Sequence, residues 1–585
     1  MTEFLIANMA PIIFGSLVFF LLLGFPVAFA LAANGIVFGF IGIELGLFQP
    51  TFFQALPERI FGGIMMNDTL LAIPFFTFMG LILERSGMAE DLLETIGQLF
   101  GPIRGGLAYA VILVGAMLAA TTGVVAASVI SMGLISLPIM LRYGYDRRLA
   151  SGVIAASGTL ARIIPPSLVL IIIADQLGKS VGDMYKGAFV PGFVLTGLYL
   201  LYVLGVTIFF AKAAPALPPE ARVFREPSGK TGGVSLLLLS IVSVGAAVFW
   251  AQTRAADKPT DELIVVAMCI GMAVAFGLAI LNRVTKLGLL SKMAERVTFV
   301  LIPPLALIFL VLGTIFIGIA TPTEGGAMGA AGALLMALAR KRLSWSLLKQ
   351  AMDSTAKLTT FVVFILVGAR VFSLTFYGVD GHKWVEHLLT DLPGGQTGFL
   401  IVVNALIFFL AFFLDFFELC FIVVPLLGPV ADKLGIDLIW FGVLLAINMQ
   451  TSFMHPPFGF ALFYLRSVAP TSAYKDHHTG KLTEPVTTGQ IYWGAIPFVV
   501  IQIIMVGLVI AFPQLVGHDP QLTDAQMNEQ GQAVDIQKML QDDSDADKSR
   551  EDAGKEDAKP GADAAAEKDD GDALTKAIRD AAKEK

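Results

Sequence analysis

Charged side chains are scarce in this sequence: Asp, Glu, Lys and Arg make up 15% of its 585 residues, whereas a soluble domain has about 25%. Apolar residues make up 56%, and the mean hydropathy is +0.76. These proportions exclude an ordinary soluble enzyme, a disordered protein and a nucleic-acid-binding protein. They are typical of a helical protein that crosses a membrane many times.

Cysteine is also scarce, with only Cys269 and Cys420 in the chain. Both lie inside apolar runs, and their positions give no disulfide framework and no metal-binding spacing. We expect both to be small buried side chains. The N-terminus lacks a basic segment and a small-residue cleavage site, so we expect the first apolar run to be a membrane helix and not a removed signal.

Negative charge is concentrated at the C-terminus. Residues 518–585 hold 19 Asp or Glu and 10 Lys or Arg, a net charge of −9, so the rest of the chain carries +2. This segment has almost no large apolar residues with which to bury a core. We expect 518–585 to be an acidic, mostly disordered tail, with a short helix near 573–582.

Apolar segments follow one another from residue 9 to residue 512, and two are too long for one crossing. A single span needs about 20 residues, whereas 106–140 and 398–430 are much longer and carry polar or acidic residues at their middles. Each fits one long tilted helix or a re-entrant hairpin that enters the membrane and returns.

Two other apolar segments, 149–176 and 438–469, contain a proline pair near their centres: Pro165-Pro166 and Pro456-Pro457. Paired prolines remove two backbone donors and clash with the preceding turn. We therefore predict two helices that break inside the membrane. Such breaks are tolerated only where they are buried in protein or line a cavity.

The order of these features recurs along the chain, which indicates an internal duplication. Chance similarity between apolar stretches is the alternative, and the ordered recurrence makes it less attractive. The recurring features are Gly105-Gly106 and Gly394-Gly395 before the long segments, Pro165-Pro166 and Pro456-Pro457 after them, and Met66–Thr69 and Met352–Thr355 upstream.

The duplication predicts four regions. The first repeat covers 1–211, a linker with two extra transmembrane helices covers 212–296, and the second repeat covers 297–517. The acidic tail, 518–585, completes the chain.

Basic loops predict the orientation, because Lys and Arg concentrate in cytoplasmic loops. If both long segments are hairpins, every basic loop lies on the same side of the membrane. The chain then crosses the membrane 12 times, and both termini lie outside. The two repeats are then inverted, a plan common among secondary transporters. The basic loops are 142–148, 212–230, 283–296 and 340–349.

Four unusual elements are expected to meet near the middle of the membrane: the two hairpin tips and the two helix breaks. Half-helix C-termini and free carbonyls suit Na⁺, whereas half-helix N-termini suit a substrate carboxylate. The alternative is that Ser, Thr and Gly only allow close helix packing. The four elements are Ala119–Ser128, Ser157–Ser167, Leu414–Glu418 and Asn448–Gly459.

Charged residues inside apolar segments are functional candidates, because they are costly at that depth. Arg162 lies inside the first break, where it either binds a substrate carboxylate or pairs with Asp415 or Glu418; the sequence leaves both readings open. Arg370 is another such charge. Arg466 lies near a helix end and is expected to extend to the cytoplasmic interface.

Two other titratable residues have structural explanations. Glu324, in the stretch Thr321–Glu324, is expected to cap a helix start rather than to bind a ligand. His455 precedes the second proline pair, where it could relay protons, but we expect it to be packed and neutral.

At these residues the chain resembles a known family, the large membrane subunit (DctM-like permease) of tripartite ATP-independent periplasmic (TRAP) transporters. The resemblance covers about residues 5–515. The supporting stretches are Leu23–Leu31, Tyr143–Ala150, Ala155–Leu160 with the Ile-Pro-Pro-Ser that follows, and Thr321–Glu324.

The resemblance implies an all-α, elevator-type transporter of the bacterial inner membrane that imports organic acids with Na⁺ as coupling ion and has no enzymatic activity. Its usual partners are a small four-helix membrane subunit and a periplasmic solute-binding protein, besides membrane lipid. No organic cofactor is implied.

The resemblance also suggests where the ligands bind. Substrate contacts are expected from the helix breaks and the first tip, and Na⁺ ligands from both tips and both breaks. The expected substrate contacts are Arg162, Ser167, Thr122 and Gly459. The expected Na⁺ ligands are Thr121, Thr122, Gly158, Thr159, Asp415, Asn448, Thr451 and Ser452.

Three features depart from the family pattern. Residues 234–282 add two apparent helices between the repeats. Thr121–Gly123 stands where the family commonly has a serine-rich turn, and Arg162 stands where a small or apolar residue is usual. For that reason the resemblance does not indicate which substrate is carried.

Three rival functions are considered. A stand-alone divalent-anion/Na⁺ symporter would have the same hairpins and inverted repeats. Transport that does not need a binding protein would identify it. A passive channel would not transport against a gradient. A membrane enzyme is disfavoured, because the sequence offers no nucleophile–base or metal constellation.

Overall fold

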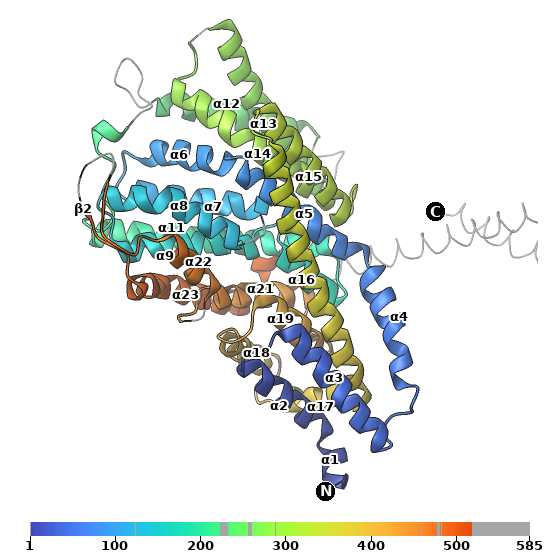
Figure 1. Cartoon of the computed structure of the whole chain (residues 1–585). Coiled ribbons are helices and arrows are strands. Elements are labelled where there is room, and N and C mark those ends of the chain that lie inside the picture. Colours follow the sequence, from blue (N-terminus) through green and yellow to red (C-terminus); the bar gives the residue numbers. More distant parts are fainter. Residues whose placement is uncertain are drawn as a thin grey trace, which may run out of the picture. The chain divides into compact units, whose positions relative to one another are not determined.

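The structure is a computed structural model, and helices make up most of it (Figure 1). It describes residues 2–122, 125–222, 232–254, 260–286, 288–457, 459–476, 480 and 482–517. In these ranges the strands are Tyr474–Lys475 (β1) and Leu482–Thr483 (β2), a short antiparallel pair in which Tyr474 lies opposite Thr483. The predicted tail at 518–585, with its short helix at 573–582, lies outside the described residues.

One set of helices, here called the scaffold group, pairs α3 with α16 and α5 with α15. Small residues allow the α3 and α16 backbones to approach closely: a Cβ atom on Gly368 would lie 2.5 Å from the Ala28 carbonyl oxygen. The scaffold group comprises Met9–Leu22 (α2), Val27–Glu44 (α3), Leu56–Ile60 (α4), Ala72–Arg85 (α5), Gly233–Arg254 (α12), Thr260–Thr285 (α13), Lys292–Phe316 (α14), Pro322–Ala339 (α15) and Trp345–Gly378 (α16).

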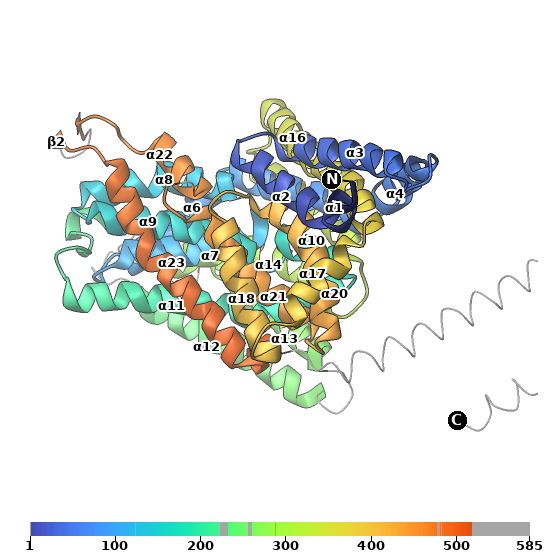
Figure 2. The ribbon, with the colours of Figure 1, turned by 90° about the horizontal axis from the view of Figure 1, so that it is seen from below.

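The second set, here called the core group, is centred on α9, which packs against α7, α8 and α23. Figure 2 shows α23 running beside α9 and α11. The core group comprises Gly106–Thr122 (α7), Val125–Arg142 (α8), Arg147–Thr159 (α9), Leu168–Leu177 (α10), Val181–Phe209 (α11), Gly395–Leu410 (α18), Phe416–Glu418 (α19), Val424–Lys433 (α20), Leu438–Met449 (α21), Phe460–Val468 (α22) and Thr488–Ala511 (α23).

Both predicted helix breaks are confirmed. A 3₁₀ turn, Leu160–Arg162 (η4), follows α9, and another, Gln450–Phe453 (η7), follows α21. The proline pairs lie in the irregular segments between these turns and the next helices. Proline cannot donate the backbone hydrogen bond that a continuous helix needs, so each helix restarts several residues later.

Neither long apolar segment is one tilted helix. Within 106–140, α7 and α8 are separated by residues 123 and 124, which lie outside the described residues, and α7 and α8 pack against each other. Within 398–430, α18 ends at Leu410 and a new helix begins at Phe416, which continues through a π-helical turn, Leu419–Val423 (η6), into α20. Both segments are interrupted where the sequence places their polar tips.

Two short helices, Met88–Phe100 (α6) and Gly381–Thr390 (α17), contact both groups. Helix α6 packs on α7 and α14, whereas α17 packs on α20, α2 and α16. α17 and α18 meet at an angle of 116°. The remaining elements are Thr2–Ala7 (α1), Phe52–Ala55 (η1), Phe61–Met65 (η2), Asp68–Leu71 (η3), Pro219–Ala221 (η5) and Pro513–Val516 (η8).

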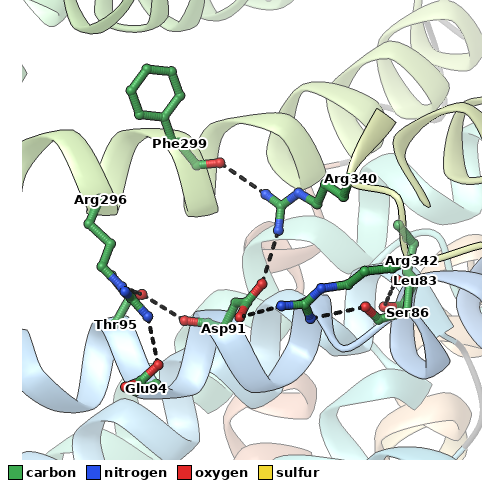
Figure 3. Close-up of polar contacts among 9 residues, drawn as sticks. All are labelled: Leu83, Ser86, Asp91, Glu94, Thr95, Arg296, Phe299, Arg340 and Arg342. Carbon is green, nitrogen blue, oxygen red and sulfur yellow. Dashed lines mark hydrogen bonds and ion pairs between the residues drawn. The ribbon is translucent and has the colours of Figure 1, made fainter. Parts of the chain in front are cut away.

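Ion pairs attach α6 to the scaffold group, an arrangement here called the α6 clamp (Figure 3). The Asp91 carboxylate contacts Arg340 Nη1 at 3.3 Å and Arg342 Nη2 at 3.2 Å. Arg296 Nη2 contacts Glu94 Oε2 at 2.6 Å. Each guanidinium in the clamp therefore has a carboxylate partner.

Seven described helices are long and apolar enough to span a membrane, or nine if each of two bent pairs counts as one span. The hairpin helices and the halves of the broken helices are individually short, and the expected 12 crossings stay a prediction. The two extra helices predicted at 234–252 and 262–281 are present as α12 and α13.

Two local predictions are wrong. The chain bends by 50° between Phe52–Met65 and Asp68–Arg85, because a π-helical turn ends at Met65 and Asn67 caps the next turn. As a result Met66–Thr69 lies at a bend, whereas Met352–Thr355 lies inside α16. Cys269 is exposed, since α13 is only lightly packed against the protein; Cys420 is buried as expected.

Candidate functional site

The first helix break buries Arg162 within a cage of aromatic rings. The residue is 6% exposed and ends the 3₁₀ turn that follows α9. Its guanidinium carbon lies 4.4 Å from the ring centre of Phe453, 5.0 Å from Phe416 and 5.8 Å from Phe417. A cation over aromatic faces is attracted by the ring quadrupole, so residues of the second hairpin and the second break stabilise a charge of the first break.

The guanidinium of Arg162 has hydrogen-bond donors without partners among the described residues. Its Nε and Nη1 atoms are buried and have no hydrogen-bond partner among the described residues. Asp415 is near enough to interact with the charge electrostatically, yet the described part of the chain shows no ion pair between Arg162 and either Asp415 or Glu418. Buried polar groups without partners are rare in folded proteins, so the unpartnered Nε and Nη1 atoms keep Arg162 a candidate for contact with a ligand.

The other predicted residues of the first break form local hydrogen bonds. Ser167 donates to the Arg162 carbonyl at 2.6 Å and accepts from Val169 N, which caps α10. Thr159 donates to the Ala156 carbonyl at 2.8 Å. At Gly158 a Cβ atom would lie 2.4 Å from Val129 Cγ2, so glycine allows α8 to approach α9.

The second break is built in the same way. Thr451 donates to the Asn448 carbonyl at 2.7 Å, and Ser452 donates to the Met449 carbonyl at 2.8 Å. Asn448 Nδ2 donates to Asn404 of α18. Gly459 begins the restart of the helix, and a Cβ atom there would lie 2.6 Å from the Phe453 carbonyl oxygen. Thr159, Thr451 and Ser452 thus each bond to a carbonyl three residues earlier.

A direct bond joins the two breaks. Gln450 Nε2 of the second break donates to Thr159 Oγ1 of the first at 3.1 Å. Beside it, Gln502 Nε2 donates to the Tyr199 hydroxyl at 2.9 Å. The side-chain oxygens of both glutamines are buried without a hydrogen-bond partner in the described structure. Gln450 was not among the expected site residues, and its place beside Thr159 depends on packing between distant segments.

The two acidic residues of the second tip cap the helix that follows. Asp415 Oδ1 accepts from Phe417 N at 3.2 Å, while Glu418 Oε2 accepts from Asp415 N at 2.8 Å. This reciprocal arrangement is a capping box. An ionised carboxylate offers about four acceptor positions, so each keeps positions for a cation.

The first tip is described only in part. Helix α7 ends at Thr122, but the side chains of Thr121 and Thr122 lie outside the described residues, as do residues 123 and 124. Their expected contacts with Na⁺ and substrate therefore stay predictions.

Three other candidate residues, Glu324, Arg466 and His455, are held by local hydrogen bonds or by packing. Glu324 and Thr321 form the expected capping box at the start of α15. Arg466 lies in the last turn of α22 and donates to the Val486 carbonyl. His455 stacks on Phe412, with ring centres 4.2 Å apart, and meets Phe408 edge-on; this packing agrees with the expected neutral role.

At the first break Arg162 supplies buried donors without partners among the described residues. The predicted hydroxyl and carboxylate oxygens belong to both breaks and the second tip, where they form local hydrogen bonds. Sequence reasoning missed the caging rings. The Pro-Pro break identified Arg162, but no local pattern identifies Phe416, Phe417 and Phe453 as its neighbours.

The comparison with known families is specific. The family described as "Tripartite ATP-independent periplasmic transporter, DctM component" matches residues 14–515. Among solved structures, the YdaH transporter of Alcanivorax borkumensis covers 79% of this chain and 89% of its own length, with a TM-score of 0.45 and 14% identity.

Curated relatives carry related names. The C4-dicarboxylate TRAP transporter large permease protein DctM of Rhodobacter capsulatus is 28% identical over 78% of this chain and 89% of its own length. Its namesake from Pseudomonas aeruginosa is 27% identical over 72% and 82%. The sialic acid TRAP transporter permease protein SiaT of Haemophilus influenzae is 23% identical over 77% of this chain and 60% of its own length.

The family match covers most of the chain, and the structure contains several helices long and apolar enough to span a membrane. The chain therefore belongs to the DctM component family of tripartite ATP-independent periplasmic transporters and is a multi-pass protein of the bacterial inner membrane.

Proposed function

We propose that the chain is the large membrane subunit of a Na⁺-coupled importer of organic acids, and that Arg162 binds a substrate carboxylate. The single observation that carries this proposal is a buried guanidinium with unpartnered nitrogens at a helix break. Relatives named for C4-dicarboxylates and sialic acid, both of which are acids, support this substrate class.

Energetics favours a ligand for Arg162. An arginine in a transmembrane helix costs about 2.5–3.5 kcal/mol on insertion scales, and the aromatic cage offsets part of that cost. A carboxylate would satisfy the free donors through charge-assisted hydrogen bonds, which are stronger than neutral ones. Substrate binding would thus satisfy the unpartnered donors of Arg162.

We propose that Na⁺ binds beside this site. The oxygens available to it are the Thr159, Thr451 and Ser452 hydroxyls, the Asn448 amide, the Asp415 carboxylate and backbone carbonyls near Gly158 and the first tip. A bound Na⁺ would place positive charge near the substrate carboxylate, and each ligand would then favour the other. Thr121 and Thr122 remain part of this proposal.

We also propose inverted repeats that move as an elevator. In support, each half of the chain has a short connecting helix, an interrupted hairpin segment, a broken helix and a final long helix in the same order. The α6 clamp attaches one connecting helix to the scaffold group, while α6 also packs on the first hairpin. A core group that slides against a fixed scaffold group would carry Arg162 across the membrane.

The expected partners are a small four-helix membrane subunit and a periplasmic binding protein that delivers the acid. Membership of a family of tripartite periplasmic transporters supports both. A stand-alone divalent-anion symporter is not favoured, because the relatives are named as TRAP permeases.

Reconstitution tests this proposal. The permease, its small subunit and its binding protein are placed in proteoliposomes with an imposed Na⁺ gradient, and uptake of labelled organic acids is compared with a K⁺ control. We expect accumulation only with both Na⁺ and the binding protein. Accumulation without the binding protein would identify a stand-alone symporter, and equilibration without accumulation would identify a channel.

A further inference from the structure

A second cationic site lies between the scaffold and core groups. Two adjoining cavities, of about 260 and 480 Å³, share Gln176, Arg370, Tyr377 and Pro425 in their walls. Arg370 and Tyr377 belong to α16 of the scaffold group, whereas Gln176 and Pro425 belong to α10 and α20 of the core group. The cavities therefore lie where the two groups meet.

The smaller cavity concentrates positive charge. Arg59 and Arg370 both line it, and none of the described residues in its wall is a carboxylate. In the described ranges neither arginine forms an ion pair or a side-chain hydrogen bond, and both are near enough to Tyr377 to act on its hydroxyl electrostatically. The larger cavity also contains Asp175 and Asp432, and Asp175 already accepts from Asn67 and Gln176.

This cavity is close in structure to the Arg162 site. Phe421, which lines the smaller cavity, stacks on Phe417 with ring centres 6.5 Å apart. Phe417 in turn lies over Arg162. An aromatic pair on one helix thus separates two sets of unpaired guanidinium groups.

We infer that the smaller cavity is a second carboxylate-binding site, where Arg59 and Arg370 hold an organic acid before it reaches Arg162. The inference rests on the proposed function for the substrate class and the direction of transport. The predicted orientation places the loops after α10 and α20 outside the cytoplasm, so this cavity faces the side from which a binding protein would deliver the acid. Rearrangement of the Phe417–Phe421 pair would then connect the two sites.

Cysteine labelling tests the cavity without transport. In full-length permease carrying Cys269→Ala and Cys420→Ala, Ser373→Cys places a thiol in the cavity wall. Reaction rates are measured in proteoliposomes with methanethiosulfonate reagents that carry a sulfonate or a trimethylammonium group. The matched control is Gln514→Cys, an exposed position outside the cavity.

Paired cations should raise the local concentration of an anionic reagent by about tenfold. We expect the sulfonate-to-trimethylammonium rate ratio at Ser373→Cys to exceed the ratio at Gln514→Cys by that factor. Combined Arg59→Gln and Arg370→Gln should abolish the excess, whereas Arg370→Lys, which keeps the charge, should preserve most of it. Succinate should slow the anionic reagent at Ser373→Cys.

The succinate effect should persist with Arg162→Ala, which separates this site from the Arg162 site. If uptake fails to depend on Arg162 while the labelling preference remains, the proposed carboxylate role of Arg162 is wrong and the cavity assignment stands. An unreactive thiol at Ser373→Cys would contradict the second site. A rate ratio that does not change when both arginines are replaced would contradict it as well.

Discussion

Arginine side chains have opposite surroundings in the α6 clamp and at the first helix break. In the clamp, Arg340 and Arg342 share the Asp91 carboxylate. At the break, Arg162 is more deeply buried but has aromatic rings around it and unpartnered nitrogens. Paired guanidinium groups attach one helix to another, whereas an unpaired one retains its capacity for a ligand. The partners of an arginine, more than its depth, indicate its role.

The strongest test of this contrast removes the unpaired charge. Arg162→Ala should lower kcat/KM for an organic acid by roughly 100-fold, because about 3 kcal/mol of charge-assisted hydrogen bonding to the carboxylate is lost. Thermal stability should be unchanged or higher, since a buried unpaired charge disappears. Uptake kinetics and thermal unfolding of the purified protein measure both effects. A large fall in stability would indicate a structural arginine instead.

Glycine at the first break should be nearly as critical. Gly158→Ala introduces a Cβ atom 2.4 Å from Val129 Cγ2, and overpacking of this kind costs about 1–3 kcal/mol. We expect a lower unfolding temperature and weaker Na⁺ dependence, because α8 must move away from α9. The matched control is Gly197→Ala on α11, where a Cβ atom would meet nothing within 4 Å. Equal behaviour of the two variants would remove the packing argument.

Breaking the α6 clamp should lower the stability of the protein and leave substrate recognition unchanged. Asp91→Ala leaves two guanidinium groups without their carboxylate, and partly exposed ion pairs are worth about 0.2–1 kcal/mol each. We expect a loss of about 1 kcal/mol in unfolding free energy, reduced at high salt, with an unchanged KM. A double-mutant cycle with Arg340→Ala measures the coupling between the two residues. An altered KM would instead connect the clamp with the substrate site.

The smallest effect is expected at the second break. His455→Phe keeps an aromatic ring between Phe408 and Phe412, and volume-conserving changes usually cost less than about 1.5 kcal/mol. Uptake and its pH profile should stay close to those of the wild type. A lost or shifted pH profile would show that His455 carries protons after all.

Much of the fold could be predicted because its signals are local. Paired prolines predict the two breaks, and segments too long for one crossing predict the interrupted hairpins. The spacing Asp415-Phe416-Phe417-Glu418 also has the form of a capping box, which the prediction of a hairpin tip with a Na⁺ ligand and a partner for Arg162 does not include. The predicted cap at Thr321–Glu324 is confirmed. Likewise Asn is a common helix cap, so Asn67 is a local signal for the bend before α5.

Other features depend on contacts between distant segments. Arg162 could be identified from its depth, but its cage comes from residues more than 250 positions away, and sequence order does not predict which rings meet it. The bond between Gln450 and Thr159 has the same origin. Arg59 gave no signal either, because it becomes notable only beside Arg370 in a shared cavity.

The central claim is that Arg162 binds the substrate carboxylate and does not bind Na⁺. The most direct measurement is Na⁺-driven uptake in proteoliposomes by the wild type, Arg162→Lys and Arg162→Ala, at varied concentrations of acid and of Na⁺. Arg162→Lys keeps the charge but loses the planar fork of donors. The account predicts a several-fold higher KM for the acid with Arg162→Lys, a much larger loss with Arg162→Ala, and unchanged Na⁺ dependence in Arg162→Lys. Wild-type kinetics in both variants would contradict it.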